Sequence, residues 1–369
     1  VWYAAMETSQ GIWVAAFSIC SYFPQFILSF VGGVWADRYP RKILIICADA
    51  LIAFATLIMV CTVPLITSKP ALLAALLVMS AVRSLGAGIQ TPAVNAVIPQ
   101  LVPKEQLMRY NGINASMQAV VNFAAPAAAG AVFAISTLRT TLMIDIVTAV
   151  IGSGILSCLA LPDQEKSTEP QSFLPDIITG IRYAFKNRFI GKLLFIYGLF
   201  TLLCVPAGYL AGLLVRRTFG NTYWYLTAVE IVGFAGMTAG GVVMSIWGGF
   251  RKRERTLTEG LFAFGAFAIG MGLTKNFILY LFLMFFYGIA LTAAQTSITT
   301  LLQEKSEPAM HGRVFGLFST MYAGFLPLGM LLFGPLADLV PLQWLMAGSG
   351  ATLIAIAGII GVRLKFRNI

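Results

Sequence analysis

The chain has 369 residues, of which 58% are hydrophobic and 11% charged, and its formal net charge is +10. With a mean hydropathy of +0.84, this composition excludes a large soluble domain and favours a protein that lies mostly within a membrane. The positive charge is scattered over short loops, which indicates a cytoplasmic rim facing anionic lipid rather than a nucleic-acid-binding surface. The five cysteines show neither metal-ligand spacing nor a disulfide framework, so we predict no metal and no cofactor.

Eleven long apolar runs follow one another along the chain. Each has about the 20 residues that a helix needs to cross roughly 30 Å of hydrocarbon. The runs cover residues 11–36, 43–65, 71–97, 112–137, 140–161, 189–215, 222–249, 256–274, 276–303, 313–338 and 341–362. They predict an all-α polytopic membrane protein with eleven full spans.

The 25 Lys and Arg residues are shared unequally between the two alternating sets of connections. One set, together with the C-terminal tail, holds nineteen of them. The opposite set holds five, which are Lys69, Arg139, Arg216, Arg217 and Lys275, and the remaining one, Arg83, lies within a run. By the positive-inside rule the rich side is cytoplasmic, so we expect the C-terminus inside and residue 1 outside.

A polar stretch at 162–176, rich in Pro, Glu and Ser, separates five runs from six. After it, the spacing of apolar and charged residues predicts a short amphipathic helix on the cytoplasmic face. We therefore expect an N-terminal bundle at 1–161, a cytoplasmic linker at 162–188 and a C-terminal bundle at 189–369. If the halves are repeats, one helix is missing at the front, and its outer end is the apolar piece at 1–6.

The two halves also contain similar short segments at corresponding places. VPKEQLMRYNG (102–112) follows the third run, and EPAMHGRVFG (307–316) follows the ninth. Each has a Pro, then an Arg five or six residues later, then a Gly, before a run that contains a mid-helix proline. Parallel repeats joined by a cytoplasmic linker are a known plan for transporters.

The loop after the first run, GGVWADRYPRK, is the sharpest local signal. It supplies a set of residues that we expect to act as a cytoplasmic gate: Gly33, Asp37, Arg38, Arg41 and Lys42. A glycine lets a neighbouring helix approach closely, and a carboxylate at the membrane edge can pair with the basic loop or with a helix end. The alternative is a basic loop that only sets topology. The matching loop of the second half, 248–255, lacks the Asp.

Four ionisable residues lie within predicted spans and are candidates for proton coupling. They are Arg83, Asp49, Asp145 and Glu230. A charge at such depth must face a partner or a wet cavity, and a carboxyl group at low dielectric can hold a proton near neutral pH. Glu230 is the leading carrier because it is nearer mid-depth than Asp49 and Asp145, whereas structural ion pairing is the alternative for Arg83, Asp49 and Asp145.

Polar side chains recur at helical spacing in several runs. Candidates for a substrate cavity are Tyr22 and Gln25 in the first run, Gln90 in the third, Asn114, Gln118 and Asn122 in the fourth, and Thr292 and Gln295 in the ninth. Polar atoms within hydrocarbon must face protein or water. Such stripes either hold helices together or line a shared aqueous path.

These features together resemble the major facilitator superfamily over the whole chain, and its macrolide-efflux branch of bacterial drug exporters in particular. The loop around Asp37 matches the superfamily's G-x-x-x-D-R/K-x-G-R/K-R/K signature, with Pro40 in place of the second glycine. The segments RSLGAGIQTPAVNAVIPQLVPKEQL (83–107), LTAVEIVGFAGMTAGG (226–241) and QEKSEPAMHGRVF (303–315) resemble the macrolide-efflux branch. A bend typical of antiporters is altered, with alanines where glycines are usual.

The resemblance implies two pseudo-symmetric six-helix bundles around a central site, in a bacterial cytoplasmic (inner) membrane. It also implies export of bulky amphipathic compounds by proton antiport with alternating access, in a chain that we expect to be monomeric. Its partners are then a small-molecule substrate, protons and lipid, without nucleic acid. The alternative transport hypothesis is export of a lipid-like or siderophore-like metabolite.

Two other classes fit the residues less well. For a membrane enzyme, no run carries an HExxH, a Ser-His arrangement or paired metal-binding carboxylates. The only histidine, His311, falls in a predicted cytoplasmic loop, where we expect a solvated or capping role. A channel is disfavoured by the repeated halves and the sparse buried charges.

Overall fold

A computed structural model describes residues 11–135, 137–159, 173–220 and 223–366. Regular structure in these residues is helical, and ten segments are long and apolar enough to cross a membrane. The fourth predicted run, 112–137, is not among these ten and forms the 29-residue helix α5. The all-helical fold class is therefore confirmed, whereas the apolar piece at 1–6 and most of the polar stretch at 162–176 lie outside the described residues.

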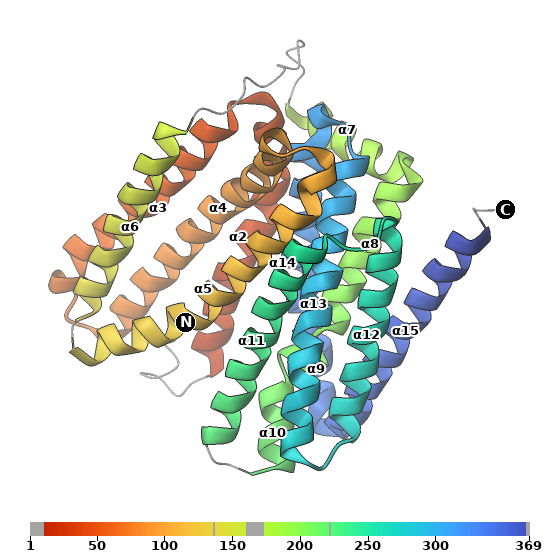
Figure 1. The fold of residues 1–369 in the computed structure, drawn as a ribbon. Helices are drawn as coiled ribbons and strands as arrows, with labels where there is room; N and C mark the ends of the chain where they lie inside the picture. The colour runs from red at the N-terminus through yellow and green to blue at the C-terminus, as the bar shows by residue number, and fades with distance from the viewer. Residues whose placement is uncertain (1–10, 136, 160–172, 221–222, 367–369) are drawn as a thin grey trace. The chain divides into compact units, whose positions relative to one another are not determined.

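The helices follow the predicted runs closely (Figure 1). Before the linker they are α2 (Gly11–Arg38), α3 (Arg41–Thr62), α4 (Lys69–Leu101), α5 (Leu107–Ile135) and α6 (Leu138–Cys158). After it come α7 (Phe173–Lys186), α8 (Arg188–Leu203), α9 (Val205–Gly208), α10 (Ala211–Thr218), α11 (Tyr223–Trp247), α12 (Arg253–Leu273), α13 (Phe277–Lys305), α14 (His311–Leu339) and α15 (Leu342–Phe366). Short 3-10 turns, η1 (Val63–Leu65), η2 (Lys104–Gln106) and η3 (Pro308–Met310), complete the set. The sixth predicted run is divided among α8, α9 and α10.

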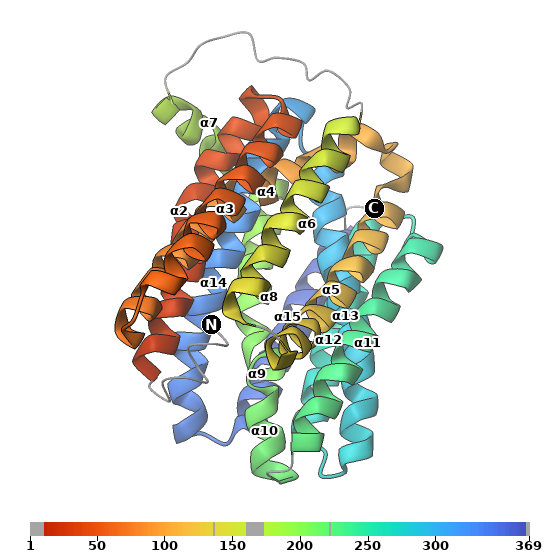
Figure 2. The same cartoon turned by 90° about the vertical axis from the view of Figure 1, so that its left-hand side faces the viewer.

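The same packing pattern occurs in both halves of the sequence. In the first half α4 packs on α2 and α3, and α3 packs on α6. In the second half α13 packs on α11 and α12, and α12 packs on α15 (Figures 1 and 2). The pattern maps α2, α3, α4 and α6 onto α11, α12, α13 and α15 in order, which is the relation expected of parallel repeats.

Two compact units can be distinguished by how the backbone packs. One comprises residues 1–101, 128–194 and 306–324, and the other comprises 102–127, 195–305 and 325–369. Each unit therefore combines one half of the sequence with the start of a helix from the other half, α14 in the first unit and α5 in the second. The division expected at the linker 162–188 stays a prediction.

The two similar segments noted in the sequence adopt similar local structure. In each, a single 3-10 turn, η2 or η3, precedes the first residue of a 29-residue helix, α5 or α14. Proline fixes an extended backbone that cannot continue the preceding helix. The resemblance between the segments thus reflects a repeated helix–turn–helix corner.

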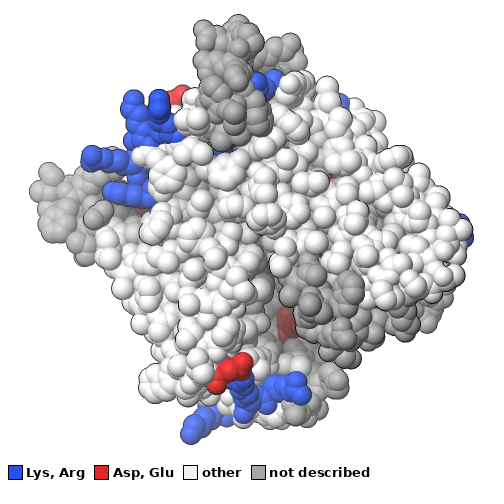
Figure 3. Space-filling view, turned by 180° about the vertical axis from the view of Figure 1, so that it is seen from behind, with Lys and Arg blue, Asp and Glu red and all other residues white. Residues whose placement is uncertain are grey.

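Apolar side chains from four helices form the core of the first unit. Its buried residues include Phe17 on α2, Met59 on α3, Leu73 on α4 and Leu142 on α6. Because lipid is as apolar as these side chains, close packing rather than transfer from water stabilises such a cluster. On the face seen in Figure 3, Lys and Arg side chains gather towards the top and the bottom of the view, and the zone between them is mostly uncharged.

Ser84 of α4 forms hydrogen bonds with the backbone of α2 beside Pro24. Pro24 lies inside α2, and one turn of the helix there is bridged by the buried Ser84 of α4. The Ser84 hydroxyl donates to the Ser21 carbonyl at 2.7 Å and accepts from the Gln25 amide at 3.0 Å. Proline has no amide hydrogen to donate within a helix, and polar backbone groups at membrane depth must be satisfied within the protein. Ser84 supplies one donor and one acceptor to this turn of α2.

Ser84→Ala should therefore destabilise the protein, because it removes both hydrogen bonds that α4 makes here to the backbone of α2. We expect a loss of about 1–3 kcal/mol, measured as a lower midpoint of thermal unfolding of the purified protein. Ser80→Ala on the same helix is the matched control, since among the described residues the Ser80 side chain bonds to the Ser21 hydroxyl, at 3.0 Å, and not to the backbone of α2. Equal effects of the two substitutions would contradict the backbone role of Ser84.

Candidate functional site

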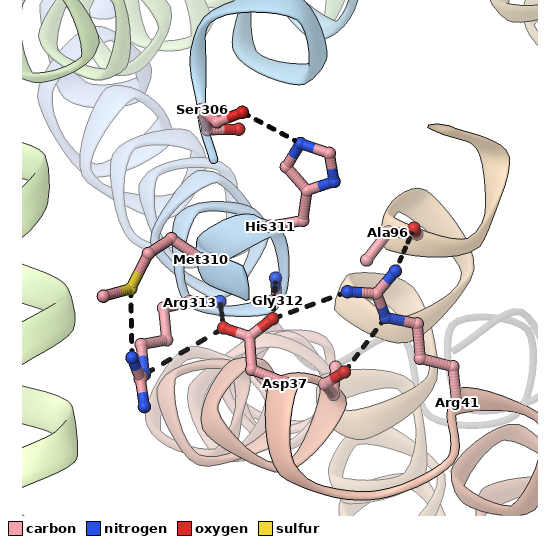
Figure 4. A network of polar contacts seen from close by, with 9 residues as sticks. Asp37, Arg41, Ala96, Ser306, Met310, His311, Gly312 and Arg313 are labelled. Atoms are coloured by element: carbon pink, nitrogen blue, oxygen red, sulfur yellow. Dashed lines mark hydrogen bonds and ion pairs between the residues drawn. The ribbon is translucent and has the colours of Figure 1, made fainter. Parts of the chain in front are cut away.

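The carboxylate of Asp37 is buried at the end of α2, with its side chain 1% exposed. One oxygen accepts the Gly312 amide at 2.6 Å, and the other accepts the Arg313 amide at 2.9 Å (Figure 4). These amides are in the first turn of α14, where helix N–H groups lack intrahelical partners and the helix dipole favours negative charge. Asp37 thus caps a helix that begins 274 residues later in the sequence.

Two arginines flank this carboxylate. Arg41, the first residue of α3, is 3.5 Å from Asp37 and also donates to the carbonyls of Ala36 and Ala96, at 3.0 and 2.5 Å. Arg313 has its Nε 4.0 Å from Asp37, and its terminal nitrogen is 3.0 Å from the Met310 sulfur. Buried charges need this degree of pairing and hydrogen bonding to offset their loss of hydration.

The backbones of α2 and α14 come into contact beside this cluster. A Cβ atom built on Gly33 would lie 2.5 Å from the Gly312 carbonyl oxygen and 2.9 Å from the Gly316 Cα. Only glycine at position 33 allows this approach. Of the predicted gate residues, the structure therefore brings Gly33, Asp37 and Arg41 together.

The other two gate residues are placed differently. Lys42 donates to the carbonyls of Ser157 and Leu159, at 2.6 and 2.8 Å, at the end of α6. A cation is favourable there because the last helical carbonyls lack intrahelical partners. Arg38 is half-buried at the last position of α2. The motif thus ties the end of α2 to α14 through Asp37, and the start of α3 to the end of α6 through Lys42.

His311 is the first residue of α14 and is buried, so a solvated role for it is wrong. One ring nitrogen is 3.2 Å from the Ser306 carbonyl (Figure 4). This contact spans η3 and stabilises the corner from which the Gly312 and Arg313 amides project. The sequence places His311 in a loop because Pro308 precedes it by three residues and the apolar run begins only at residue 313.

The second unit has a related but different corner. Arg253, the first residue of α12, bonds to the Gly248 carbonyl five residues earlier, as Arg41 does to Ala36. Its counter-charge is Glu304 on α13, 3.3 Å away, and it also donates to the Glu105 carbonyl at 3.4 Å in η2. The sequence shows that this loop lacks an Asp, but the acid from a distant helix could not be predicted.

Small polar residues hold α5 against its neighbours in this second unit. Asn111 donates to Thr300 at 2.9 Å and to Gln303 at 2.5 Å. Ser116 donates to the Thr238 carbonyl on α11 at 2.9 Å. Because α11 is the counterpart of α2, the Ser116 contact corresponds to that of α14 with α2 in the first unit. These contacts were missed because each residue alone resembles the small polar residues that commonly join membrane helices.

Arg83 is paired with Asp145, one of the other ionisable candidates. Its guanidinium bonds to both carboxylate oxygens, with the longer bond at 3.4 Å. Thr56 on α3 also donates to this carboxylate, at 3.2 Å. The two charged side chains are 41% and 34% exposed, so the pair that joins α4 to α6 is not sealed in the packed core.

The remaining ionisable candidates have different surroundings. Asp49 on α3 accepts a bond from Gln90 on α4 at 2.6 Å. Gln90 lies two turns after Arg83 on the same helix, so α4 presents two polar groups to two carboxylates. Glu230 is exposed on α11, and within the described part of the chain it has no ionic or hydrogen-bonding partner.

The predicted cavity residues differ in how deeply they are buried and fall into three groups. Thr292 is buried and donates to the carbonyls of Met237 and Gly288, both at 3.1 Å, so it joins α13 to α11. The half-buried members are Tyr22, Gln25, Gln90, Asn114 and Gln295, and the exposed members are Gln118 and Asn122.

No group of three or more potential metal ligands is found among the residues that the structure describes.

The repeated helices, the Asp37 signature and the intramembrane charges agree with the comparison to known families. A model described as the Major Facilitator Superfamily matches residues 3–330. The chain belongs to the major facilitator superfamily. It is therefore a multi-span membrane protein of a transporter family. This membership confirms the predicted major facilitator fold.

Individual relatives and a solved structure support the assignment to this superfamily. Macrolide efflux protein A of Streptococcus pyogenes is 27% identical over 362 residues, covering 97% of this chain and 88% of the relative. Enterobactin exporter EntS of Escherichia coli is 27% identical over 352 residues, covering 92% and 79%. The crystal structure of the human organic anion transporter MFSD10 superposes with a TM-score of 0.79 at 13% identity, covering 94% of this chain and 82% of that chain. This last likeness concerns the fold alone.

Proposed function

We propose that this superfamily member exports bulky amphipathic compounds of the macrolide type by proton antiport with alternating access. The observation that carries the proposal is the Arg83–Asp145 pair, a partly exposed ion pair in the spans of a chain similar to macrolide efflux proteins. An ionisable pair at membrane depth is typical of proton relays in transporters. The proposed setting is a monomer in a bacterial cytoplasmic membrane, with its C-terminus inside.

The Asp37 cluster supplies the conformational part of this proposal. A carboxylate that caps α14 and pairs with Arg41 stabilises one arrangement of α2 and α14 (Figure 4). If these helices separate during transport, the amides and guanidinium lose that partner at once. The Asp37 cluster, which we call the latch, therefore stabilises the state in which α2 and α14 are in contact. Switching proteins commonly use interfaces that have two discrete arrangements in this way.

Similarity to the enterobactin exporter favours a second candidate of the same class. The substrate would then be a siderophore-like or lipid-like metabolite rather than a macrolide. Both candidates share the fold, the latch and the proton sites, so only the ligand separates them.

An efflux panel tests the proposal directly. Cells with and without the protein are loaded with macrolides, other amphipathic drugs and catecholate siderophores, and efflux is followed before and after collapse of the proton gradient. We expect gradient-dependent efflux of macrolides. Export of siderophores alone would select the second candidate, and efflux that survives collapse of the gradient would contradict proton antiport.

Glu230→Gln tests the leading proton carrier. Because glutamine cannot exchange a proton, we expect export against a gradient in proteoliposomes to be abolished while ligand binding and the thermal unfolding midpoint stay near wild type. Glu259→Gln, at an exposed ion pair with Arg255, is the control and should transport normally. Undiminished proton-driven export by Glu230→Gln would remove Glu230 from the mechanism.

A further inference from the structure

The linker helix α7 is held at the level where the next span enters the membrane. It ends at Lys186, and α8 begins at Arg188, so a single residue separates them. That residue, Asn187, donates its amide to the Tyr183 carbonyl at 2.9 Å. Its side-chain oxygen accepts the Phe189 and Ile190 amides at 3.1 and 3.4 Å, as an N-cap of α8 does. The end of α7 therefore cannot move far from the membrane surface.

One side of α7 packs against the start of α14 and the turn before it. Gly180 and Ala184 are buried on this side, and a Cβ atom built on Gly180 would lie 3.0 Å from the Arg313 Cβ. The Tyr183 hydroxyl accepts the Glu307 amide at 3.1 Å, in front of η3. The helix also packs on α2 (Figure 2). It therefore touches the same first turn of α14 that Asp37 caps.

The other side of α7 is a mixed apolar and basic surface, which we call the outer face. It comprises Ile178, Arg182, Phe185 and Lys186. Ile178 and Phe185 are 55% and 63% exposed, and Arg182 and Lys186 are exposed beside them. Residues seven apart lie on one side of a helix, so the two apolar side chains form one strip with a cation at its edge.

We propose that the outer face of α7 binds anionic phospholipid of the cytoplasmic leaflet and thereby presses α7 against the first turn of α14. The role in transport rests on the latch proposed above, whereas lipid binding does not. Charge and position select this occupant. An amphipathic helix with basic and aromatic side chains at the membrane boundary binds by burying its apolar strip and attracting anionic headgroups.

The binding would reach the latch through a short series of contacts. Anionic lipid neutralises Arg182 and Lys186 and fixes the helix that carries them. The opposite side of α7 then stays against the stem of Arg313, whose backbone amide and guanidinium both face Asp37. The lipid therefore favours the state in which α2 and α14 are joined.

Lipid binding is tested with the purified full-length chain in detergent. The protein is titrated with phosphatidylglycerol or phosphatidylcholine, and the apparent affinity is taken from the rise in the unfolding midpoint. We expect a preference for phosphatidylglycerol, and a loss of about fivefold in affinity for each cation removed from the outer face. Arg182→Gln with Lys186→Gln is the test variant. Lys104→Gln with Arg251→Gln, which removes two exposed charges from other cytoplasmic loops, is the matched control.

The link to the latch is tested by hydrogen exchange in nanodiscs. We expect slower exchange of the Gly312 and Arg313 amides with phosphatidylglycerol than with phosphatidylcholine, and loss of this difference in the α7 double variant only. Equal stabilisation by the two lipids, or equal losses in the test and control variants, would overturn the lipid site. A lipid preference without any change at these amides would overturn the coupling. Neither measurement involves a transported compound, so a negative efflux panel would not affect the result.

Discussion

Asp37→Asn should lower export at least tenfold and reduce the stability of the folded protein by about 3–5 kcal/mol, the typical cost of breaking a buried ion pair. The substitution keeps the shape of the side chain but removes its charge. Arg41, whose side chain is 2% exposed, then loses its carboxylate partner. An amide also offers only one acceptor oxygen, whereas Asp37 accepts from both Gly312 and Arg313.

The measurements are efflux in cells, the thermal unfolding midpoint, and hydrogen exchange of the two α14 amides. All three should change together, because one contact serves stability and conformational preference. Asp338→Asn is the matched control: Asp338 also pairs with an arginine, Arg217, but its side chain is 72% exposed. Exposed pairs contribute about 0–1 kcal/mol. Normal export by Asp37→Asn would favour the alternative in which the loop only sets topology.

The spans were predictable because the evidence for them is local. A continuous apolar run of sufficient length specifies a membrane helix wherever it occurs, and the described helices follow the predicted runs. The Asp37 motif was also visible in one short segment. Its partners on α14 were not, since nothing in residues 33–42 identifies the amides of Gly312 and Arg313 as the groups that meet it.

For the charged residues within the spans, the sequence likewise identified the residues but not their partners. Arg83 and Asp145 could be picked out singly because charged residues at such depth are rare. That they pair with each other, and that Thr56 adds a bond, depends on the mutual rotation of α3, α4 and α6. Ser84 was missed altogether, because a serine gives no sign in the sequence that it bonds to the backbone of another helix beside Pro24.

The division of the sixth predicted run shows how proline acts inside a span. The run was predicted as one continuous helix at 189–215, but helical structure is interrupted at Cys204 and again at Tyr209 and Leu210. Pro206 has no amide hydrogen to bond the carbonyl four residues earlier, which weakens the helix there. The Leu210 amide bonds instead to the Val205 carbonyl five residues back, at 3.0 Å. Hydropathy alone does not register such breaks.

Variants of the Arg83–Asp145 pair can separate a role in proton transfer from a role in folding. Asp145→Asn cannot exchange a proton, so we expect export driven by a proton gradient to fall at least a hundredfold. Exchange of labelled for unlabelled substrate across proteoliposomes needs no net proton movement, and should stay within a few fold of wild type. Asp49→Asn, at a carboxylate bonded to Gln90 rather than to a cation, is the comparison variant.

The double variant that combines Arg83→Asp with Asp145→Arg decides whether the pair is structural or carries a proton. A structural pair needs only opposite charges at contact distance. If the pair is structural, the double variant should therefore regain the stability and the uphill export that each single variant loses. A proton site depends on which helix carries the carboxylate and on the bond that Thr56 donates to it. We therefore expect the double variant to recover the unfolding midpoint but not proton-driven export, and recovery of both would make the pair structural.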